Sequence, residues 1–76
     1  MKNLFTVKLN ELIQESGKTQ NKISAELKIP KQKLSNWKTG YTEPNLDDLI
    51  TLALYFDVST DYLLGLEDET GIKQKI

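Results

Sequence analysis

Apolar residues recur with helical spacing from the beginning of the chain. Phe5, Leu9, Leu12 and Ile13 fall at i, i+4, i+7 and i+8, which is the pattern of a helix with one buried face. The pattern predicts a helix from about residue 3 to residue 16. Gly17 follows it and suits the left-handed conformation at which many helices end.

The next two predicted helices are short and close together. Thr19 can cap a helix whose Ile23 and Leu27 face inward. Pro30 lacks an amide hydrogen and fits the first turn of a helix, so a third helix is expected from residue 30 or 31 until Gly40. A tight turn should join these two helices.

Two further helices are expected after a loop that contains Pro44. Asn45 can cap the first of them, and its buried stripe is predicted to consist of Leu46, Leu49, Ile50, Ala53 and Phe56. Three apolar or aromatic residues of the same helix then fall outside the main core face, namely Leu52, Leu54 and Tyr55. A short last helix should begin at residue 59 or 60, end at residue 64 and be closed by Gly65.

No segment of the chain reads as a strand, so the predicted fold is all-α. One apolar cluster accounts for the core, and it consists of Phe5, Leu9, Leu12, Ile23, Leu27, Ile29, Leu34, Trp37, Leu46, Leu49, Ile50, Ala53, Phe56, Val58 and Leu63. We expect a single helical domain over residues 1–65. Residues 66–76 are mostly polar and are expected to form a frayed tail.

Charge is divided unevenly along the chain, although the formal net charge is only −1. Residues 18–40 carry six lysines and one acid, Glu26, whereas residues 41–69 carry eight acids and no base. Such a molecule can turn a positive surface toward phosphates while its opposite surface repels them. The alternative is that these charges only solvate helix faces, because separation in sequence does not prove separation in space.

The composition excludes several kinds of chemistry. The chain has no Cys and no His, which removes disulfides, thiolate and imidazole metal ligands and nucleophiles based on these residues. Asp47 and Asp48 are explained by the first turn of a helix, and the acids of residues 67–69 lack the spacing of a calcium loop. We therefore expect no enzyme activity, cofactor or metal. No apolar run is long enough to span a membrane, so we expect a cytoplasmic protein.

The third predicted helix has apolar residues only at the positions that pack against the rest of the domain. Leu34 and Trp37 are three residues apart, so Trp37 is expected in the core rather than stacked on a base. The remaining positions are polar, namely Lys31, Gln32, Lys33, Ser35 and Asn36. A helix of this kind is suited to the major groove of DNA, and we predict that double-stranded DNA is the partner.

Several spacings together resemble the phage repressor and Cro type of helix-turn-helix protein, the XRE family. The resemblance covers residues 5–65 and is carried by Thr19-Gln20, Ile23-Ser24, Leu27, Leu34-Ser35-Asn36-Trp37, Gly40, Pro44 and the run Val58-Ser59-Thr60-Asp61-Tyr62-Leu63-Leu64-Gly65. It implies a compact five-helix, lambda-repressor-like domain in which helices 2 and 3 form the helix-turn-helix. It also implies a transcriptional regulator, usually a dimer, whose third helix enters the major groove.

The resemblance also implies roles for particular residues. Base contacts fall to Lys31, Gln32 and Asn36, and the amides of Gln32 and Asn36 offer the donor and acceptor that adenine requires. Flanking or phosphate contacts fall to Thr19, Gln20, Lys22, Lys33, Ser35, Lys38, Thr39 and Tyr41. Gln32 and Asn36 could also simply solvate a helix face, which is the alternative to a reading role.

Two departures from the family pattern affect the predicted binding unit. Lys28 stands in the turn where many relatives have Gly, so we expect it in a left-handed conformation that costs roughly 1–2 kcal/mol. Lys38 stands where relatives often have one member of a buried ion pair, and is expected to be free for a phosphate.

A domain this small reaches one half-site, so we expect a homodimer that represses transcription from an inverted-repeat operator. Candidate dimer residues are Leu54, Tyr55, Tyr62 and Leu66, although these side chains could instead pack within the domain. Release from DNA is expected to come from a protein partner, from proteolysis or from dilution. The alternative function is a protein-interaction module of the same fold, such as an antitoxin or antirepressor-type regulator.

Overall fold

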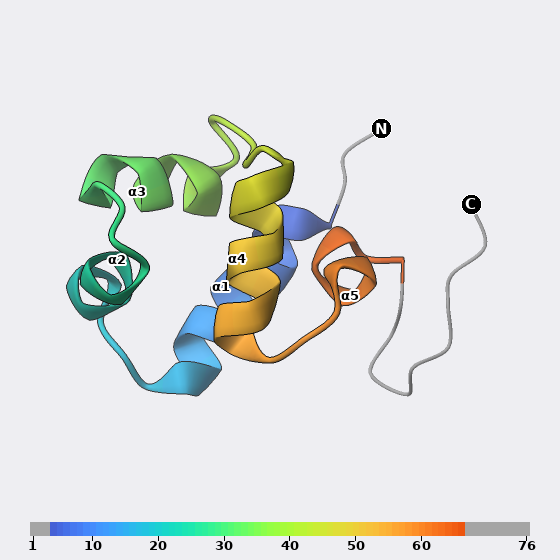
Figure 1. Cartoon of the computed structure of the whole chain (residues 1–76), viewed down its shortest axis with the longest axis horizontal. Coiled ribbons are helices and arrows are strands. Elements are labelled where there is room, and N and C mark those ends of the chain that lie inside the picture. Colours follow the sequence, from blue (N-terminus) through green and yellow to red (C-terminus); the bar gives the residue numbers. More distant parts are fainter. Residues whose placement is uncertain (1–3, 67–76) are drawn as a thin grey trace.

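The computed structural model describes residues 4–66 of the chain. Within this range it contains five helices and no strand, so the predicted all-α, five-helix fold is confirmed (Figure 1). The helices are α1 (Phe5–Ser16), α2 (Gln20–Leu27), α3 (Lys31–Thr39), α4 (Leu46–Phe56) and α5 (Thr60–Leu64). The tail expected from residue 66 lies outside the described residues, apart from Leu66 itself.

Side-chain caps fix where three of the helices begin. Oxygen atoms of Thr19, Asn45 and Ser59 accept hydrogen bonds from backbone amides three residues ahead, at 3.1, 2.8 and 3.0 Å. Each bond satisfies one of the amide groups that have no partner within the helix. The caps at Thr19 and Asn45 were predicted from the sequence, whereas residue 59 was predicted only as a possible first residue of the last helix.

The core lies where α1 meets the other helices. The buried apolar side chains are Phe5, Leu9, Ile13, Ile23, Leu34, Trp37, Leu49, Leu52, Ala53 and Leu63. Trp37 is only 2% exposed, which confirms its predicted structural role. Five predicted core residues are only partly buried and pack against this cluster, namely Leu12, Leu27, Ile29, Phe56 and Val58.

The predicted buried face of α4 was partly wrong. Leu46 and Ile50 are exposed, whereas Leu52, expected outside the core, is almost completely buried. The helix buries the side on which Leu49, Leu52 and Ala53 lie, and Leu46 and Ile50 are rotated away from it. Because apolar residues occupy most positions of this helix, its sequence does not define one apolar side.

Candidate nucleic-acid interface

Helix α3 is anchored by two buried side chains and presents its polar residues outward. Leu34 is fully buried and Trp37 nearly so, while Lys31 and Gln32 are exposed and Ser35 and Asn36 are half-buried. The helix lies beside α2 at one edge of the molecule (Figure 1). The predicted division between core and polar positions of this helix is therefore present in the structure.

The turn between α2 and α3 depends on a lysine in an unusual conformation. Lys28 has φ 59° and ψ 43°, which is left-handed, as expected from the glycine that many relatives have in this turn. Its backbone N–H donates to the carbonyl oxygen of Ala25 at 3.2 Å, and the backbone N–H of Ile29 donates to the carbonyl oxygen of Ser24 at 3.0 Å. Pro30 is extended and precedes α3, so Lys31 is the first residue of the helix.

The two predicted amide readers contact each other. Nε2 of Gln32 donates a hydrogen bond to Oδ1 of Asn36 at 2.8 Å, one turn further along α3. Gln32 keeps its carbonyl oxygen and one N–H, and Asn36 keeps its own NH₂ group. The pair therefore leaves both acceptor and donor groups for an outside ligand.

Gln20 and Lys38 form a second polar pair, between the start of α2 and the end of α3. Nζ of Lys38 donates to Oε1 of Gln20 at 2.9 Å. The side-chain Nε2 of Gln20 in turn lies 3.5 Å from the backbone carbonyl oxygen of Lys31. Lys38 is half-buried and engaged within the protein, so the expectation that it is free for a phosphate does not describe this structure.

Lys33 is also held within the protein. Its Nζ lies 3.0 Å from Oδ2 of Asp48 on α4 and 5.6 Å from the centre of the Trp37 ring. The remaining predicted contact residues are more open. Thr19, Lys22, Thr39 and Tyr41 are all exposed.

Asn10 supports α3, and its role was missed in the sequence analysis. Its Nδ2 donates to the carbonyl of Thr6 at 2.8 Å on α1 and to the carbonyl of Lys38 at 2.9 Å on α3. The second bond satisfies a carbonyl near the C-terminus of α3, where helices lack internal partners. An asparagine inside a helix is unfavourable unless its side chain has a specific partner, and this was the signal in the sequence that could have pointed to Asn10.

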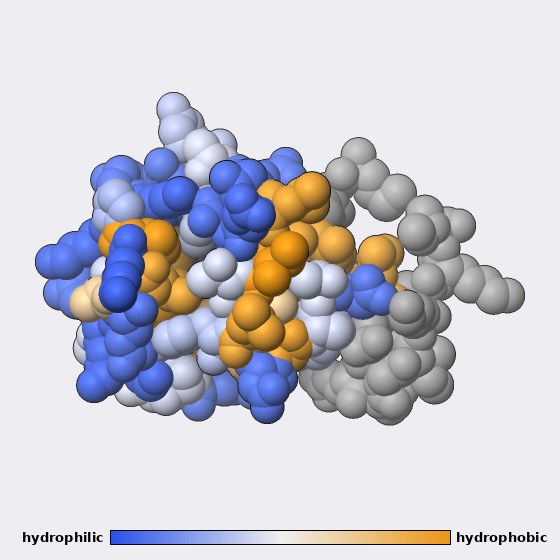
Figure 2. All heavy atoms as spheres, viewed as in Figure 1, coloured by the Kyte–Doolittle hydropathy of each residue, from blue (hydrophilic) through white to orange (hydrophobic). Residues whose placement is uncertain are grey.

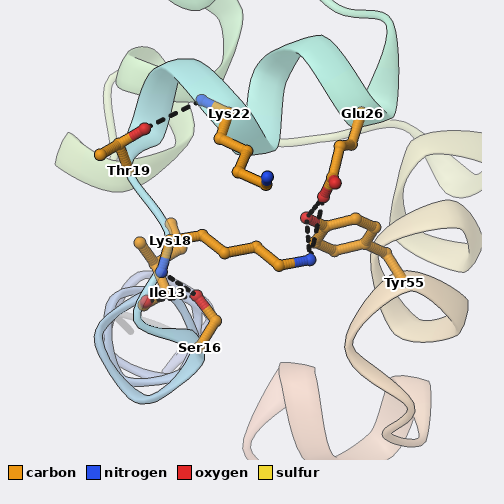
Figure 3. Close-up of polar contacts among 7 residues, drawn as sticks. All are labelled: Ile13, Ser16, Lys18, Thr19, Lys22, Glu26 and Tyr55. Atoms are coloured by element: carbon orange, nitrogen blue, oxygen red, sulfur yellow. Dashed lines mark hydrogen bonds and ion pairs between the residues drawn. The ribbon is translucent and has the colours of Figure 1, made fainter.

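A cluster of Lys18, Glu26 and Tyr55 connects α2 with α4 (Figure 3). The Tyr55 hydroxyl donates to the Glu26 carboxylate, and Nζ of Lys18 reaches Glu26 at 2.9 Å and the Tyr55 oxygen at 3.2 Å. The hydrogen bond from Tyr55, followed by that from Lys18, lowers the pKa of Glu26 below its ordinary value. Hydrogen bonding to Glu26 and Tyr55 raises the pKa of Lys18, while burial and the bond to Glu26 raise the pKa of Tyr55. The cluster helps to fix the helix-turn-helix on the rest of the domain.

The four candidate dimer residues differ in their surroundings. Leu54 is 78% exposed, whereas Tyr55 is half-buried and belongs to the cluster just described. Tyr62 and Leu66 are half-buried, and Nζ of Lys8 lies 4.9 Å from the centre of the Tyr62 ring. Tyr55 is therefore the member of this group least available to a second copy.

Within residues 4–66, none of the helices is long and apolar enough to cross a membrane. The same residues contain no group of acids that could hold a metal ion.

Comparisons with known proteins agree with this geometry. Residues 6–69 match the helix-turn-helix domain family. The transcriptional regulator ImmR of Bacillus subtilis is 40% identical over 68 residues, which cover 90% of this chain and 53% of ImmR. The transcriptional activator BcrR of Enterococcus faecalis is 30% identical over 64 residues, which cover 84% of this chain and 31% of BcrR.

A solved structure also shares the fold. The crystal structure of a transcriptional regulator from Listeria innocua superposes with a TM-score of 0.79 at 30% identity, over 91% of this chain and 64% of that one. The chain thus spans about half the length of ImmR and less than two thirds of the other two proteins.

Proposed function

We propose that this chain, which belongs to the helix-turn-helix family, binds duplex DNA sequence-specifically and regulates transcription. One observation carries the proposal. Helix α3 is held by Leu34 and Trp37 on its inner side and exposes a continuous polar side that begins at its N-terminus. This is the arrangement by which a recognition helix enters the major groove with its first residues toward the bases.

The assigned base readers are Lys31, Gln32 and Asn36. The free oxygen and remaining N–H of Gln32 match N6 and N7 of adenine, and Lys31 can donate to O6 or N7 of guanine. The bond between Gln32 and Asn36 orients both amides before DNA is met, so less side-chain entropy is lost on binding. A good paired contact discriminates between bases by about 1–3 kcal/mol.

Affinity is assigned to contacts with the phosphates. Lys22 and the exposed hydroxyls of Thr19, Thr39 and Tyr41 are candidates, and Gln20 lies at the first turn of α2, where free amides favour an anion. All ten basic residues are lysines, so guanine cannot be read by arginine and discrimination falls mainly to the amides. Lys33 and Lys38 instead hold α3 in place, because Lys33 pairs with Asp48 on α4 and Lys38 donates a hydrogen bond to Gln20 on α2.

The proposed regulator is a dimeric repressor on an inverted-repeat operator. One domain of this size covers a single half-site, and two recognition helices about 34 Å apart would meet successive major grooves. We place the contact between copies near α5, at Tyr62 and Leu66, with Leu54 as a further candidate. Binding over a promoter would exclude the polymerase.

Selection from random duplex DNA tests the proposal. The chain should enrich one inverted repeat, and the stoichiometry on the enriched duplex should be two chains for each site. Recovery of no common sequence would refute sequence-specific binding. One chain on each site would refute the dimer while leaving the reading helix in place.

A further inference from the structure

Helix α4 carries an exposed apolar ridge formed by Leu46, Ile50 and Leu54. These residues follow one another at intervals of four and are 77%, 51% and 78% exposed. Figure 2 shows the ridge as a continuous apolar band along α4 with hydrophilic residues at both ends. Single exposed apolar side chains are ordinary, but three in line on one helix mark a surface that another molecule covers.

The ridge lies on a different helix from the residues assigned to DNA. It lies on α4, whereas the polar residues assigned to DNA lie on α2 and its N-cap, on α3 and in the loop that follows α3. Both surfaces are exposed in the same molecule.

The charge around the ridge favours one kind of occupant. Residues 41–66 contain five acids, namely Glu43, Asp47, Asp48, Asp57 and Asp61, and no base. Asp48 is paired with Lys33, while Glu43, Asp47 and Asp57 are exposed at or near the two ends of α4. A second copy of the same ridge would bring like charges together, and nucleic acid and anionic lipid would both be repelled.

We propose that the α4 ridge is a docking surface for a basic amphipathic helix of a partner protein. Residues at intervals of four form the ridge by which one helix packs into the groove of another, here over about 12 Å of helix length. The partner helix presents apolar side chains to Leu46, Ile50 and Leu54 and lysines or arginines to the acids beside them. This proposal does not depend on DNA binding.

A labelled synthetic peptide tests the charge and the ridge together. The probe is a helical peptide of about 15 residues, four turns long, with leucines at intervals of four and lysines on both sides of them. Its twin carries glutamates in place of the lysines. Fluorescence anisotropy is measured with the full chain and with Leu46→Ser, Ile50→Ser and Val7→Ser. Val7 is the matched control, because it lies on α1 and is 50% exposed.

The lysine peptide should bind the wild-type chain. Its affinity should be at least about tenfold lower for either ridge variant and unchanged for Val7→Ser. The glutamate twin should not bind, and affinity for DNA should be the same in all four proteins. Equal binding of both peptides, equal loss with Val7→Ser, or unchanged affinity in the ridge variants would overturn the proposal. Sedimentation that shows a wild-type dimer abolished by Ile50→Ser would also overturn it, because the occupant would then be a second copy.

Discussion

Replacing Lys28 with glycine should stabilise the domain. Lys28 is the left-handed residue between α2 and α3, with φ 59° and ψ 43°, and its side chain is exposed. In this conformation the Cβ atom of an L-residue crowds the following carbonyl oxygen, at a cost of about 1–2 kcal/mol. Glycine has no Cβ and is free of that cost.

The gain is smaller than the strain that is removed. Glycine also makes the unfolded chain more flexible, which cancels about 0.5–1 kcal/mol of the stabilisation gained by removing the strain. The net increase in the free energy of unfolding should be about 0.5–1 kcal/mol. In a domain of this size that corresponds to a rise in Tm of about 2–8 °C.

Urea unfolding followed by Trp37 fluorescence measures this free energy, and thermal unfolding followed by circular dichroism measures the Tm. The buried position of Trp37 makes its emission sensitive to unfolding. Lys28→Ala is the control, because it shortens the side chain but keeps Cβ, and it should not stabilise the domain. A Lys28→Gly protein that is no more stable than wild type or Lys28→Ala would refute the strain argument.

Three further predictions follow from the geometry. Because the folded-state pKa of Glu26 is lowered, its contribution to stability is present at neutral pH and is lost as pH falls through that lowered pKa. Tyr55→Phe lacks the hydroxyl bonded to Glu26, so its free energy of unfolding should fall less than that of wild type as the pH is lowered. An equal fall in the two proteins would contradict this prediction. Gly65→Ala should lower the Tm more than Gly17→Ala does. Both glycines have positive φ, but a Cβ at Gly65 would lie 2.6 Å from the Cβ of Leu4, whereas a Cβ at Gly17 would meet open space. Equal losses of Tm would count against the packing argument. Affinity for duplex DNA should fall linearly with salt on a logarithmic plot, and a flat plot would rule out phosphate contacts.

Local features of the fold could be predicted from the sequence. Caps such as Thr19 and Asn45 and the inward Trp37 depend on residues close to them in the chain, whereas the left-handed Lys28 was expected from the resemblance to the family. Apolar spacing identified α4 but not its buried side, because Leu46 and Ile50 fit a helical stripe as well as Leu52 does. The choice between them is made by the helices that pack against α4.

Contacts between distant residues explain what the sequence did not reveal about the candidate site. The bond from Asn10 to the Lys38 carbonyl joins residues 28 positions apart, and Lys18 and Tyr55 are 37 positions apart. No periodicity marks such pairs, because they depend on the final packing of the helices. For the same reason Tyr55 was assigned to a dimer surface, although its hydroxyl is used to join α4 to α2.

The central claim is that the outer side of α3 reads base sequence. Its most direct test is the ratio of affinities for the selected duplex and for an unrelated duplex, measured for wild type, Gln32→Ala and Lys22→Ala. Loss of the amide should reduce this ratio by roughly tenfold, whereas Lys22→Ala should weaken both affinities and leave the ratio unchanged. If Gln32→Ala weakens binding equally to both duplexes, Gln32 does not read bases and the claim fails.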